Sequence, residues 1–444
     1  MDQSSPTPQK TTNYRWMVCF LLFLVTTVNY MDRSVLGFLK PTLEKEMGWD
    51  QVDYSNMVVC FQLGYALSYL LMGRLIDRIG VRHGLGLAVI LWSLASMAHG
   101  FMGLLKGYGK VELGAGGYVW TVSATVLGFM IARFALGLAE GGNFPGSIKG
   151  VSEWFPKKER ALATGLFNTG SNVGALMTPM VIPLVVALFN GWQAAFFTTA
   201  ALDFCWLILW YCIYQSPDRQ PRVSAAELAY IRSDPVEPPA KKIPWIQLLS
   251  YRPTWAFTIG MLMTSPIWWF YLFWIPDFFN KRFGLDLQHL GPPIIVIYLM
   301  SIIGSIGGGW ISSTLIKRGF SINFSRKTAM LICALCVVPV FAASQVENMW
   351  MAVILLGLAT AAHQGFSANL FTLVSDTMPK YTVSSVVGIG GMAGAVGAMG
   401  VSKFAGYVLK WTNNNYLSLF IIAASAYLAA LLIIHLLVPR IKQE

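Results

Sequence analysis

The sequence predicts an all-α integral membrane protein whose twelve transmembrane helices form two six-helix halves. Three observations support this fold class. Of the 444 residues, 55% are hydrophobic and only 12% are charged, whereas soluble domains carry roughly a quarter charged residues. Twelve apolar runs approach or exceed the length of about 20 residues that a helix needs to cross a bilayer. A short motif of the first half also recurs at the equivalent place in the second half.

The apolar runs set the expected order of the helices. Each run is bounded by polar or glycine-rich segments, which predict the connections between helices. The expected spans are residues 16–39, 53–73, 84–105, 118–142, 160–189, 192–214, 254–279, 290–316, 327–345, 349–375, 382–409 and 415–438.

The basic residues predict the orientation of the chain. If the N-terminus is cytoplasmic, most of the 32 Lys and Arg residues fall in even-numbered connections and at the two termini. Basic residues accumulate on the cytoplasmic side of membrane proteins. We therefore expect both termini in the cytoplasm and a multi-pass protein of the cell (inner) membrane. The net charge of +11 is interpreted as a topology signal, not as a nucleic-acid-binding surface.

The longest polar stretch separates the sixth and seventh runs and is rich in proline. It predicts a cytoplasmic linker, so that the chain divides into an N-terminal half (1–215), a linker (216–252) and a C-terminal half (253–444). Within the linker, Ser224 and Glu227 have the spacing of a capping box, which predicts the start of a short surface helix.

The two halves resemble each other in sequence. VSEWFPKKERALATG (151–165) aligns without a gap with VSDTMPKYTVSSVVG (374–388), with five of fifteen positions identical. Both segments lie between the fourth and fifth spans of their half. Parallel six-helix repeats with a substrate site at their interface are the architecture of one large class of secondary transporter.

Four ionisable residues fall inside expected spans of the first half: Asp32 and Arg33 in the first span, Arg133 and Glu140 in the fourth. Such residues are costly to bury and are functional candidates by default. Arg133 and Glu140 are two helical turns apart, about 10.5 Å along the axis, which is too far for a tight pair. Asp32 and Arg33 point about 100° apart. One arrangement turns Arg33 toward a cavity and Asp32 toward the span-four charges; the alternative is a static ion network that only fixes helix register.

Two further charges fall within spans. Asp203, in the sixth span, has no partner apparent from the sequence, and its function stays open. Lys403 lies near the outer end of the eleventh span, and we expect its amine to extend to the membrane surface.

Residues 73–84, GRLIDRIGVRHG, resemble the signature loop of the major facilitator superfamily. The matching positions are Gly73, Asp77, Arg78, Gly80 and Arg82. The resemblance implies that Asp77 and Arg78 brace the helix ends against the other half in one conformation and so act in gating. The alternative is a basic loop that only sets topology.

Further motifs narrow the resemblance. YMDR in the first span, RFALGLAEGGNFPG (133–146), SEWFPKKERALATGLFNTGSNVGAL (152–176) and SRK (325–327) resemble the anion:cation symporter family. That family imports organic acid anions with protons and includes galactonate, glucarate and hexuronate carriers. FTLVSD (371–376), AHQG (362–365) and the start of the run from 152 are most similar to the hexuronate (glucuronate and galacturonate) transporters.

The resemblance implies roles for the buried charges. In galactonate-type carriers, proton-carrying acids occupy the positions of Asp32 and Glu140. Arg33 matches the ligand of the substrate carboxylate, and Arg133 matches the partner of the second acid. Tyr65, in the second span, matches a tyrosine of the family's cavity. Proton-coupled transport of a carboxylate is therefore what these positions imply.

Recognition of a sugar acid also needs amides, hydroxyls and aromatic faces. Asn168 and Ser171 are three residues apart in the fifth span and hence share one face. Ser171 stands where galactonate-type carriers have a glutamine, a departure that argues against an aldonate substrate. Both residues are candidates for binding the sugar.

The C-terminal half offers a second set of candidates. The seventh span contains PIWWFYLFWIP, in which Trp269 and Tyr271 are candidates to stack on or bond a pyranose ring. His363, Gln364 and Asn369 give the tenth span a polar stripe. Aromatic residues in spans more often pack or anchor at the interface, and this alternative stays open.

The sequence thus predicts a proton-coupled symporter that imports a sugar-acid anion, with a hexuronate as the favoured substrate. The alternatives are an aldonate, aldarate or other organic-anion symporter, an organic-anion exchanger, or sodium coupling. We find no metal-spaced His/Cys cluster, nucleophile motif or phosphate-binding loop, so we expect neither an enzyme nor a metal site. The expected partners are a small carboxylate, the proton as coupling ion and the lipid bilayer, with no other cofactor and no nucleic acid, and we expect a monomer.

Overall fold

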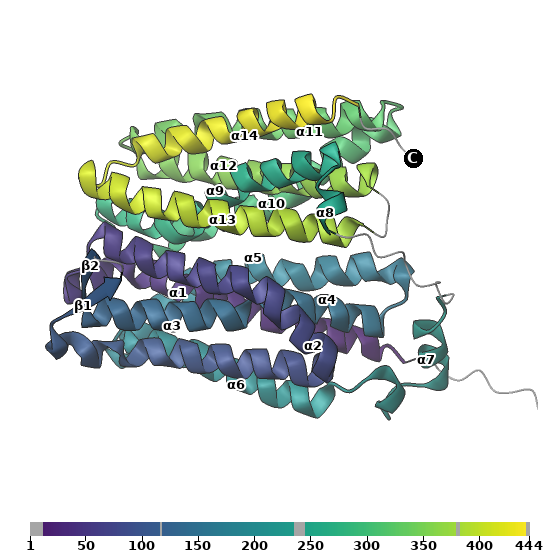
Figure 1. Cartoon of the computed structure of the whole chain (residues 1–444), viewed down its shortest axis with the longest axis horizontal. Helices are drawn as coiled ribbons and strands as arrows, with labels where there is room; N and C mark the ends of the chain where they lie inside the picture. The colour runs from purple at the N-terminus through teal and green to yellow at the C-terminus, as the bar shows by residue number, and fades with distance from the viewer. Residues whose placement is uncertain (1–11, 116–117, 235–244, 379–381, 441–444) are drawn as a thin grey trace, which may run out of the picture.

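The computed structural model describes residues 12–115, 118–234, 245–378 and 382–440. It is a bundle of long helices in which α1–α6 and α9–α14 form two groups that lie side by side (Figure 1). The N-terminal elements are α1 (Tyr14–Met47), α2 (Gln51–Phe101), η1 (Met102–Tyr108), β1 (Lys110–Ala115), β2 (Tyr118–Ser123), α3 (Ala124–Glu140), α4 (Asn143–Trp154), α5 (Lys157–Phe189) and α6 (Gln193–Ile213). The elements that follow are η2 (Pro217–Arg219), α7 (Ala225–Ile231), α8 (Trp245–Leu248), α9 (Arg252–Phe283), α10 (Gly291–Lys317), α11 (Ile322–Val337), η3 (Val338–Ser344), α12 (Met349–Thr377), α13 (Val383–Trp411) and α14 (Leu417–Leu437).

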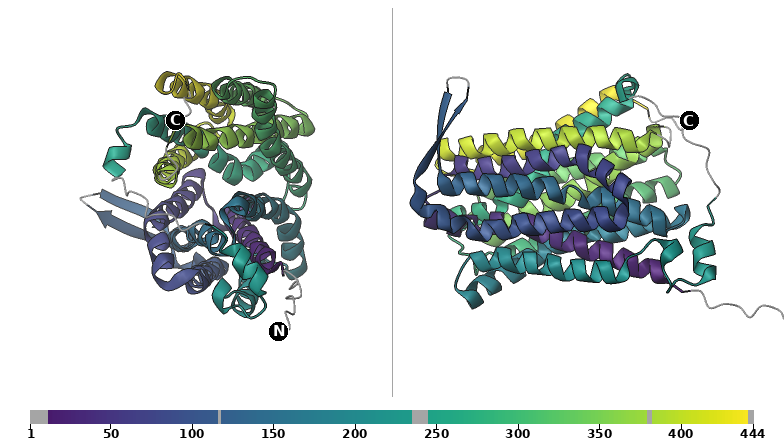
Figure 2. Two further views of the ribbon diagram at one scale, coloured as in Figure 1. Left: turned by 90° about the vertical axis from the view of Figure 1, so that its right-hand side faces the viewer. Right: turned by 60° about the horizontal axis from the view of Figure 1, so that its bottom comes forward.

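The bundle has two distinguishable ends. We call the end that carries β1 and β2 the hairpin end, and the opposite end, which carries α7 and α8, the linker end (Figures 1 and 2). Helix α1 begins and α14 ends at the linker end (Figure 1), as an even number of spans requires. Which end faces the cytoplasm stays a prediction.

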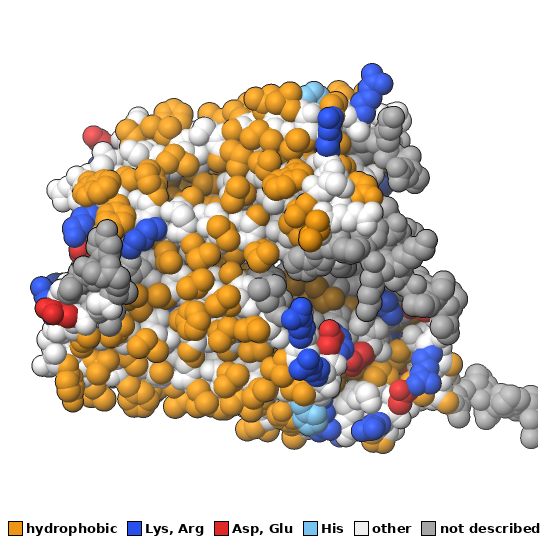
Figure 3. All heavy atoms as spheres, viewed as in Figure 1, with side chains coloured by type: hydrophobic (Ala, Val, Ile, Leu, Met, Phe, Trp, Pro, Cys, Tyr) orange, Lys and Arg blue, Asp and Glu red, His pale blue; other side chains and the backbone are white. Residues whose placement is uncertain are grey.

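The predicted membrane-spanning character is confirmed. Eleven helical segments of the described residues are long and apolar enough to cross a membrane. The remaining expected span, 53–73, forms the first limb of α2 and is not among these eleven. On the face shown in Figure 3, hydrophobic side chains cover the middle of the bundle and charged side chains gather at its two ends.

Helix α2 contains the expected second and third spans, which are joined by a sharp reversal at Gly80. This residue has φ of +82° and ψ of 161°, a conformation outside the helical region that only glycine adopts freely. The connection expected from the loop motif 73–84 is therefore shorter than predicted, because the helix continues on both sides of Gly80.

The expected fourth span, 118–142, is wrong at its start. Residues 118–123 form strand β2, which pairs antiparallel with β1, and the helix begins only at Ala124. The helix then continues beyond the predicted end, because α4 follows α3 after a break at Gly141 and Gly142. As a result Glu140 lies within the membrane-spanning segment Ala124–Trp154, well before its end.

The linker contains the short helix that the capping-box spacing predicted, but only half of the box forms. The Ser224 hydroxyl accepts a hydrogen bond from the backbone N–H of Glu227 at 3.2 Å. The carboxylate of Glu227 is instead used elsewhere: it accepts from the backbone N–H groups of Tyr14 and Arg15, at 3.0 and 3.1 Å. It thereby satisfies free N–H groups at the start of α1 and ties the linker to the first half.

The two halves meet along a few helices. In the boundary α2 packs against α13, α1 against α9 and α5 against α10. The first limb of α2 carries polar side chains into this boundary: Gln62 donates to Ser402 of α13 at 2.9 Å. These polar contacts across the halves explain why the second span is less apolar than its neighbours.

Candidate functional site: charges buried between the halves

Arg33 of α1 and Glu140 of α3 form a buried ion pair. The Nε and Nη2 atoms of Arg33 donate to Oε2 of Glu140 at 3.1 and 3.0 Å. Nη2 also donates to the side-chain oxygen of Asn29, one turn earlier on α1, at 3.3 Å. Arg33 is 2% exposed and Glu140 is fully buried. The pair is therefore shielded from bulk water. The attraction between two opposite charges is stronger in such an environment than in water.

Four aromatic rings surround the guanidinium of Arg33. Its central carbon lies 4.5 Å from the ring centre of Tyr30, 4.7 Å from that of Tyr65 and 5.3 Å from that of Phe61. The fourth ring, Trp269 at 5.1 Å, comes from α9 of the other half. Aromatic faces attract a cation at these distances. We call Arg33, Glu140 and these four rings the Arg33 box.

Arg133 does not pair with Glu140, as the two-turn separation predicted and contrary to what the resemblance implied. Its Nη2 donates to the backbone carbonyl oxygen of Arg33 at 3.0 Å, and its Nε and Nη1 atoms are buried without an acceptor among the residues that the structure describes. The physical reason is the two-turn separation along one helix axis: Arg133 lies at a different height from Glu140 and reaches the backbone of α1 instead.

Asp32 and Arg33 contact different neighbours, but in the opposite sense to the expected arrangement. Arg33 faces Glu140 of the fourth span, whereas Asp32 accepts a hydrogen bond from the Ser96 hydroxyl of α2 at 2.7 Å. The 100° angle between adjacent helical residues separates the two side chains as predicted. The sequence did not contain the rotation of α1 relative to its neighbours, which decides the direction of each.

Asn168 and Ser171 lie on α5, where Asn168 is exposed and Ser171 is half-buried. The Ser171 hydroxyl donates to the backbone carbonyl of Asn168 at 2.7 Å. Across the boundary, Gln364 of α12 donates to Asn172 of α5 at 3.5 Å. Asn172 and Gln364 therefore face each other across the boundary, whereas Asn168 and Ser171 are only near neighbours of Asn172 on α5.

Three other residues predicted to bind the substrate each contact other residues of the C-terminal half. His363 is hydrogen-bonded through Nδ1 to the Tyr427 hydroxyl at 2.7 Å, and its ring stacks on Trp268 with centroids 5.1 Å apart. Asn369 donates to two backbone carbonyls, both at 2.9 Å, that link α10 and α12. Tyr271 is buried, and its ring centre lies 5.9 Å from that of Phe270 on the same helix. None of the three contacts the Arg33 box in the described structure.

The two residues assigned to gating do not bridge the halves in this conformation. Asp77 accepts from the Lys149 amine of α4, in its own half, at 2.8 Å. Arg78 is exposed. In the other half, Arg326 of the SRK motif pairs with Asp376 at 3.0 Å. The charged side chains of these loops thus form pairs within each half.

A second buried ion pair, at the hairpin end, joins the two halves and was not predicted. Lys40 of α1 and Asp277 of α9 pair at 2.5 Å, and both are fully buried. The same carboxylate accepts from Gln51 of α2 at 3.1 Å and from the Tyr416 hydroxyl. Lys40 also lies 3.6 Å from Glu44. We call Lys40, Gln51, Asp277 and Tyr416 the Lys40 cluster.

More exposed contacts ring the Lys40 cluster. Lys410 of α13 donates to Asp50 at 2.7 Å and Lys281 of α9 donates to Glu44 at 3.0 Å. Partial burial alone would raise the pKa of Asp50, but hydrogen bonds from Lys410 and from the backbone of Asp53 hold that pKa below its usual range. Lys403 donates across the halves to Asn56, and the expected extension of its amine to the membrane surface stays a prediction. The hairpin end is therefore closed by contacts between the halves.

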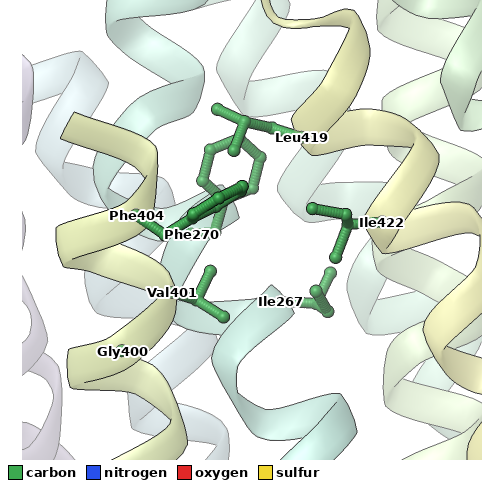
Figure 4. A pocket seen from close by; sticks show the side chains of 7 residues that line it. All are labelled: Ile267, Phe270, Gly400, Val401, Phe404, Leu419 and Ile422. Carbon is green, nitrogen blue, oxygen red and sulfur yellow. The ribbon is translucent and has the colours of Figure 1, made fainter. Parts of the chain in front are cut away.

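An apolar cavity of about 170 Å³ lies elsewhere, among α9, α13 and α14 (Figure 4). It is lined by Ile267, Phe270, Gly400, Val401, Phe404, Leu419 and Ile422. No polar side chain lines it, and a sugar acid needs several. The cavity is therefore not a candidate for the substrate site.

The two-half helical bundle, its apolar belt and the charges buried at its boundary are the features of a membrane transporter. Comparison with known proteins identifies the family: the sequence model of the Major Facilitator Superfamily matches residues 22–402. The chain belongs to this family. It is accordingly a multi-pass membrane transporter and not an enzyme, as the sequence predicted.

Relatives with known names are similar over nearly the whole chain. The "Probable galactarate/D-glucarate transporter" of Bacillus subtilis (strain 168) is 28% identical over 100% of this chain and 96% of its own length. The "Hexuronate transporter" of Escherichia coli (strain K12) is 29% identical over 87% of this chain and 85% of its own. The solved inward-open structure of the xylose transporter from E. coli matches with a TM-score of 0.72 at 15% identity, over 96% of both chains, which shows the shared fold.

Proposed function

We propose that this protein is a proton-coupled symporter that imports a sugar-acid anion, with a hexuronate as its substrate, by alternating access. The names of its relatives, which are transporters of hexuronate and of galactarate or D-glucarate, support this substrate class. With the N-terminus in the cytoplasm, the hairpin end faces outward. The Lys40 cluster then closes the outer end, and the structure represents a state that is closed to the outside.

The observation that carries the proposal is the Arg33–Glu140 pair inside its aromatic box. Arg33 offers a planar set of donors that matches a carboxylate in geometry, and Glu140 accepts from two of those donors. A substrate carboxylate binds Arg33 by replacing Glu140. The surrounding rings of Tyr65 and Trp269 then provide flat faces for a pyranose.

This exchange couples the anion to a proton. Once the substrate carboxylate is bound to Arg33, an ionised Glu140 would be a buried charge without a counter-ion, which is costly. A proton on Glu140 removes that cost and releases Arg33 to the substrate. Proton and anion therefore each strengthen the binding of the other, as thermodynamic linkage requires.

The test is uptake of radiolabelled glucuronate into proteoliposomes with an imposed pH gradient. We expect the wild-type protein to accumulate glucuronate when the lumen is alkaline. Glu140→Gln is expected to lose this accumulation but to retain exchange of external for internal glucuronate, because glutamine cannot cycle a proton. Glu347→Gln, at an exposed position, is the matched control and should behave as wild type.

Two results would contradict the proposal. Gradient-driven accumulation by the Glu140→Gln protein would show that this residue does not carry the coupling. Accumulation that requires a sodium gradient, and not a pH gradient, would replace the proton as coupling ion. Competition by galactarate and galactonate in the same assay ranks the sugar acids.

A further inference from the structure

Asp203 of α6 is a buried acid to which neither the sequence nor the proposed mechanism gives a role. It is 1% exposed, and neither of its carboxyl oxygens accepts a hydrogen bond from a donor among the described residues. Asp32 of α1 is equally buried. One of its oxygens accepts from Ser96, and the other has no donor within hydrogen-bond distance in the described part of the chain.

The two acids lie side by side. The Ser96 hydroxyl that binds Asp32 is 3.3 Å from the hydroxyl of Thr199, and Thr199 lies one turn before Asp203 on α6. Residues four apart share a helix face, so Asp203 faces the same point from α6 that Asp32 reaches from α1. The side chains of Asp32 and Asp203 contact each other, and the indole of Trp92 contacts Asp203 from α2.

A contact between two ionised carboxylates joins two acceptors and contains no donor. Carboxylates a few ångströms apart in a buried site do not both ionise, and a shared proton converts their contact into an O–H···O hydrogen bond. We propose that Asp203 shares one proton with Asp32, the residue at a position that the resemblance already assigned to a proton-carrying acid, so that the proton is held by the pair and not by Asp32 alone.

The charges around the two carboxyl groups also favour one shared proton. Arg133 attracts Asp32 from α3, whereas Glu140 repels Asp203. His99 lies one turn beyond Ser96 on α2, and its Nδ1 is hydrogen-bonded to the backbone carbonyl oxygen of Ala95. Counting Asp203, the buried groups comprise three acids and two arginines, and one proton on the acid pair makes this set electrically neutral.

A monovalent cation such as sodium is the competing occupant, because the two carboxyls and two hydroxyls supply oxygen ligands. The contact between the carboxyls favours the proton, since an ion between them would hold them apart. If the chain is the proton-coupled symporter proposed above, Asp203 is part of the proton site that the resemblance assigned to Asp32; this role rests on that proposed function, whereas the shared proton does not.

Infrared spectroscopy of the purified protein tests the shared proton without substrate or transport. We expect the neutral-pH spectrum to contain the carbonyl band of a protonated carboxylic acid that is absent from Asp203→Asn and from Asp32→Asn. Asparagine has the shape of aspartate, and its amide can donate to the remaining carboxylate, which then stays ionised. Asp277→Asn is the matched control, because Asp277 is a buried acid paired with Lys40, and the band should persist in it.

The readout separates this inference from the proposed function. The band should also persist in Glu140→Gln, whatever that protein does in transport. An unchanged band in both Asp203→Asn and Asp32→Asn would overturn the shared proton. Loss of the wild-type band on titration with sodium but not with potassium would replace the proton by a cation. If Asp203→Asn does not fold, Asp32→Asn alone decides the question.

Discussion

Replacing Asp277 by asparagine removes the counter-ion of Lys40 and is expected to open the hairpin end. The pair joins α1 to α9 at 2.5 Å, and both residues are fully buried. Removing one partner of a buried ion pair costs about 3–5 kcal/mol, because the other charge is left uncompensated. Glu44, 3.6 Å from the Lys40 amine, compensates in part, so the lower limit of about 3 kcal/mol applies.

This energy acts on the balance between the closed and open hairpin end. The charge is buried only while the halves touch there, so the substitution destabilises the closed state specifically. At 1.36 kcal/mol per factor of ten, about 3 kcal/mol shifts the balance toward opening by roughly a hundredfold. The exposed Asp50–Lys410 contact at the same end is worth about 0–1 kcal/mol, a shift of at most roughly fivefold.

The assay is labelling of a cysteine at position 55 by a membrane-impermeant maleimide, in a background without the native cysteines. Ser55 is fully buried, and it packs against Gly406 of α13 in the closed end. Ser55→Cys should label slowly alone and up to roughly a hundredfold faster with Asp277→Asn, following the energy of the buried pair. Asp50→Asn is the matched control and should change the rate little.

The reasoning would be refuted by a labelling rate that Asp277→Asn leaves unchanged, or by one that Asp50→Asn raises as much as Asp277→Asn does. The double variant Lys40→Met with Asp277→Leu provides a further check. It leaves no unpaired charge at the site, and replacing a whole buried pair with apolar residues is often close to neutral. It should therefore label more slowly than Asp277→Asn alone.

Two further outcomes test the Arg33 box and the helix packing. Trp269→Leu removes a ring from Arg33, a contact worth about 0.5–2 kcal/mol. The Kd for glucuronate, measured by calorimetry, should therefore rise by roughly two- to thirtyfold. Trp268→Leu is the control, and an equal rise of the Kd in that variant would count against the Arg33 box. Gly137→Ala places a Cβ 2.1 Å from a carbonyl oxygen of α2 and should lower the Tm, since overpacking costs about 1–3 kcal/mol. Gly165→Ala meets nothing within 4 Å and should hold or raise the Tm, so a fall as large as that of Gly137→Ala would contradict the packing argument.

The fold could be predicted because hydrophobic length alone defines a membrane-spanning helix. The start of the fourth span, which was misplaced, shows the limit of that signal. Residues 118–123, YVWTVS, are as apolar as a helix would need, but they are aromatic and β-branched residues that favour a strand. Hydropathy does not separate the two, and the pairing partner at 110–115 lies outside the apolar run.

The candidate site was only partly predictable, because its contacts join distant parts of the chain. The sequence identified Asp32, Arg33, Arg133 and Glu140 as buried charges, and the helical angle required adjacent residues to face different neighbours. It did not contain the rotation of α1, so the partners of Arg33 and Asp32 were exchanged. Asp203 had no apparent partner, since Asp32 is 171 positions away and on another helix.

One seam between α1 and α9 connects the proposed substrate site with the hairpin end, the proposed outer gate. Arg33 and Lys40 are two turns apart on α1 and share a face. Trp269, Phe273 and Asp277 recur at four-residue intervals on α9 and share the opposing face. Arg33 contacts Trp269, and Lys40 pairs with Asp277. Helices move as rigid bodies in such transitions, so separating α1 from α9 at the gate also withdraws the Trp269 ring from Arg33. Opening the hairpin end therefore changes the surroundings of the guanidinium proposed to bind the anion, and the occupancy of Arg33 in turn biases the proposed gate.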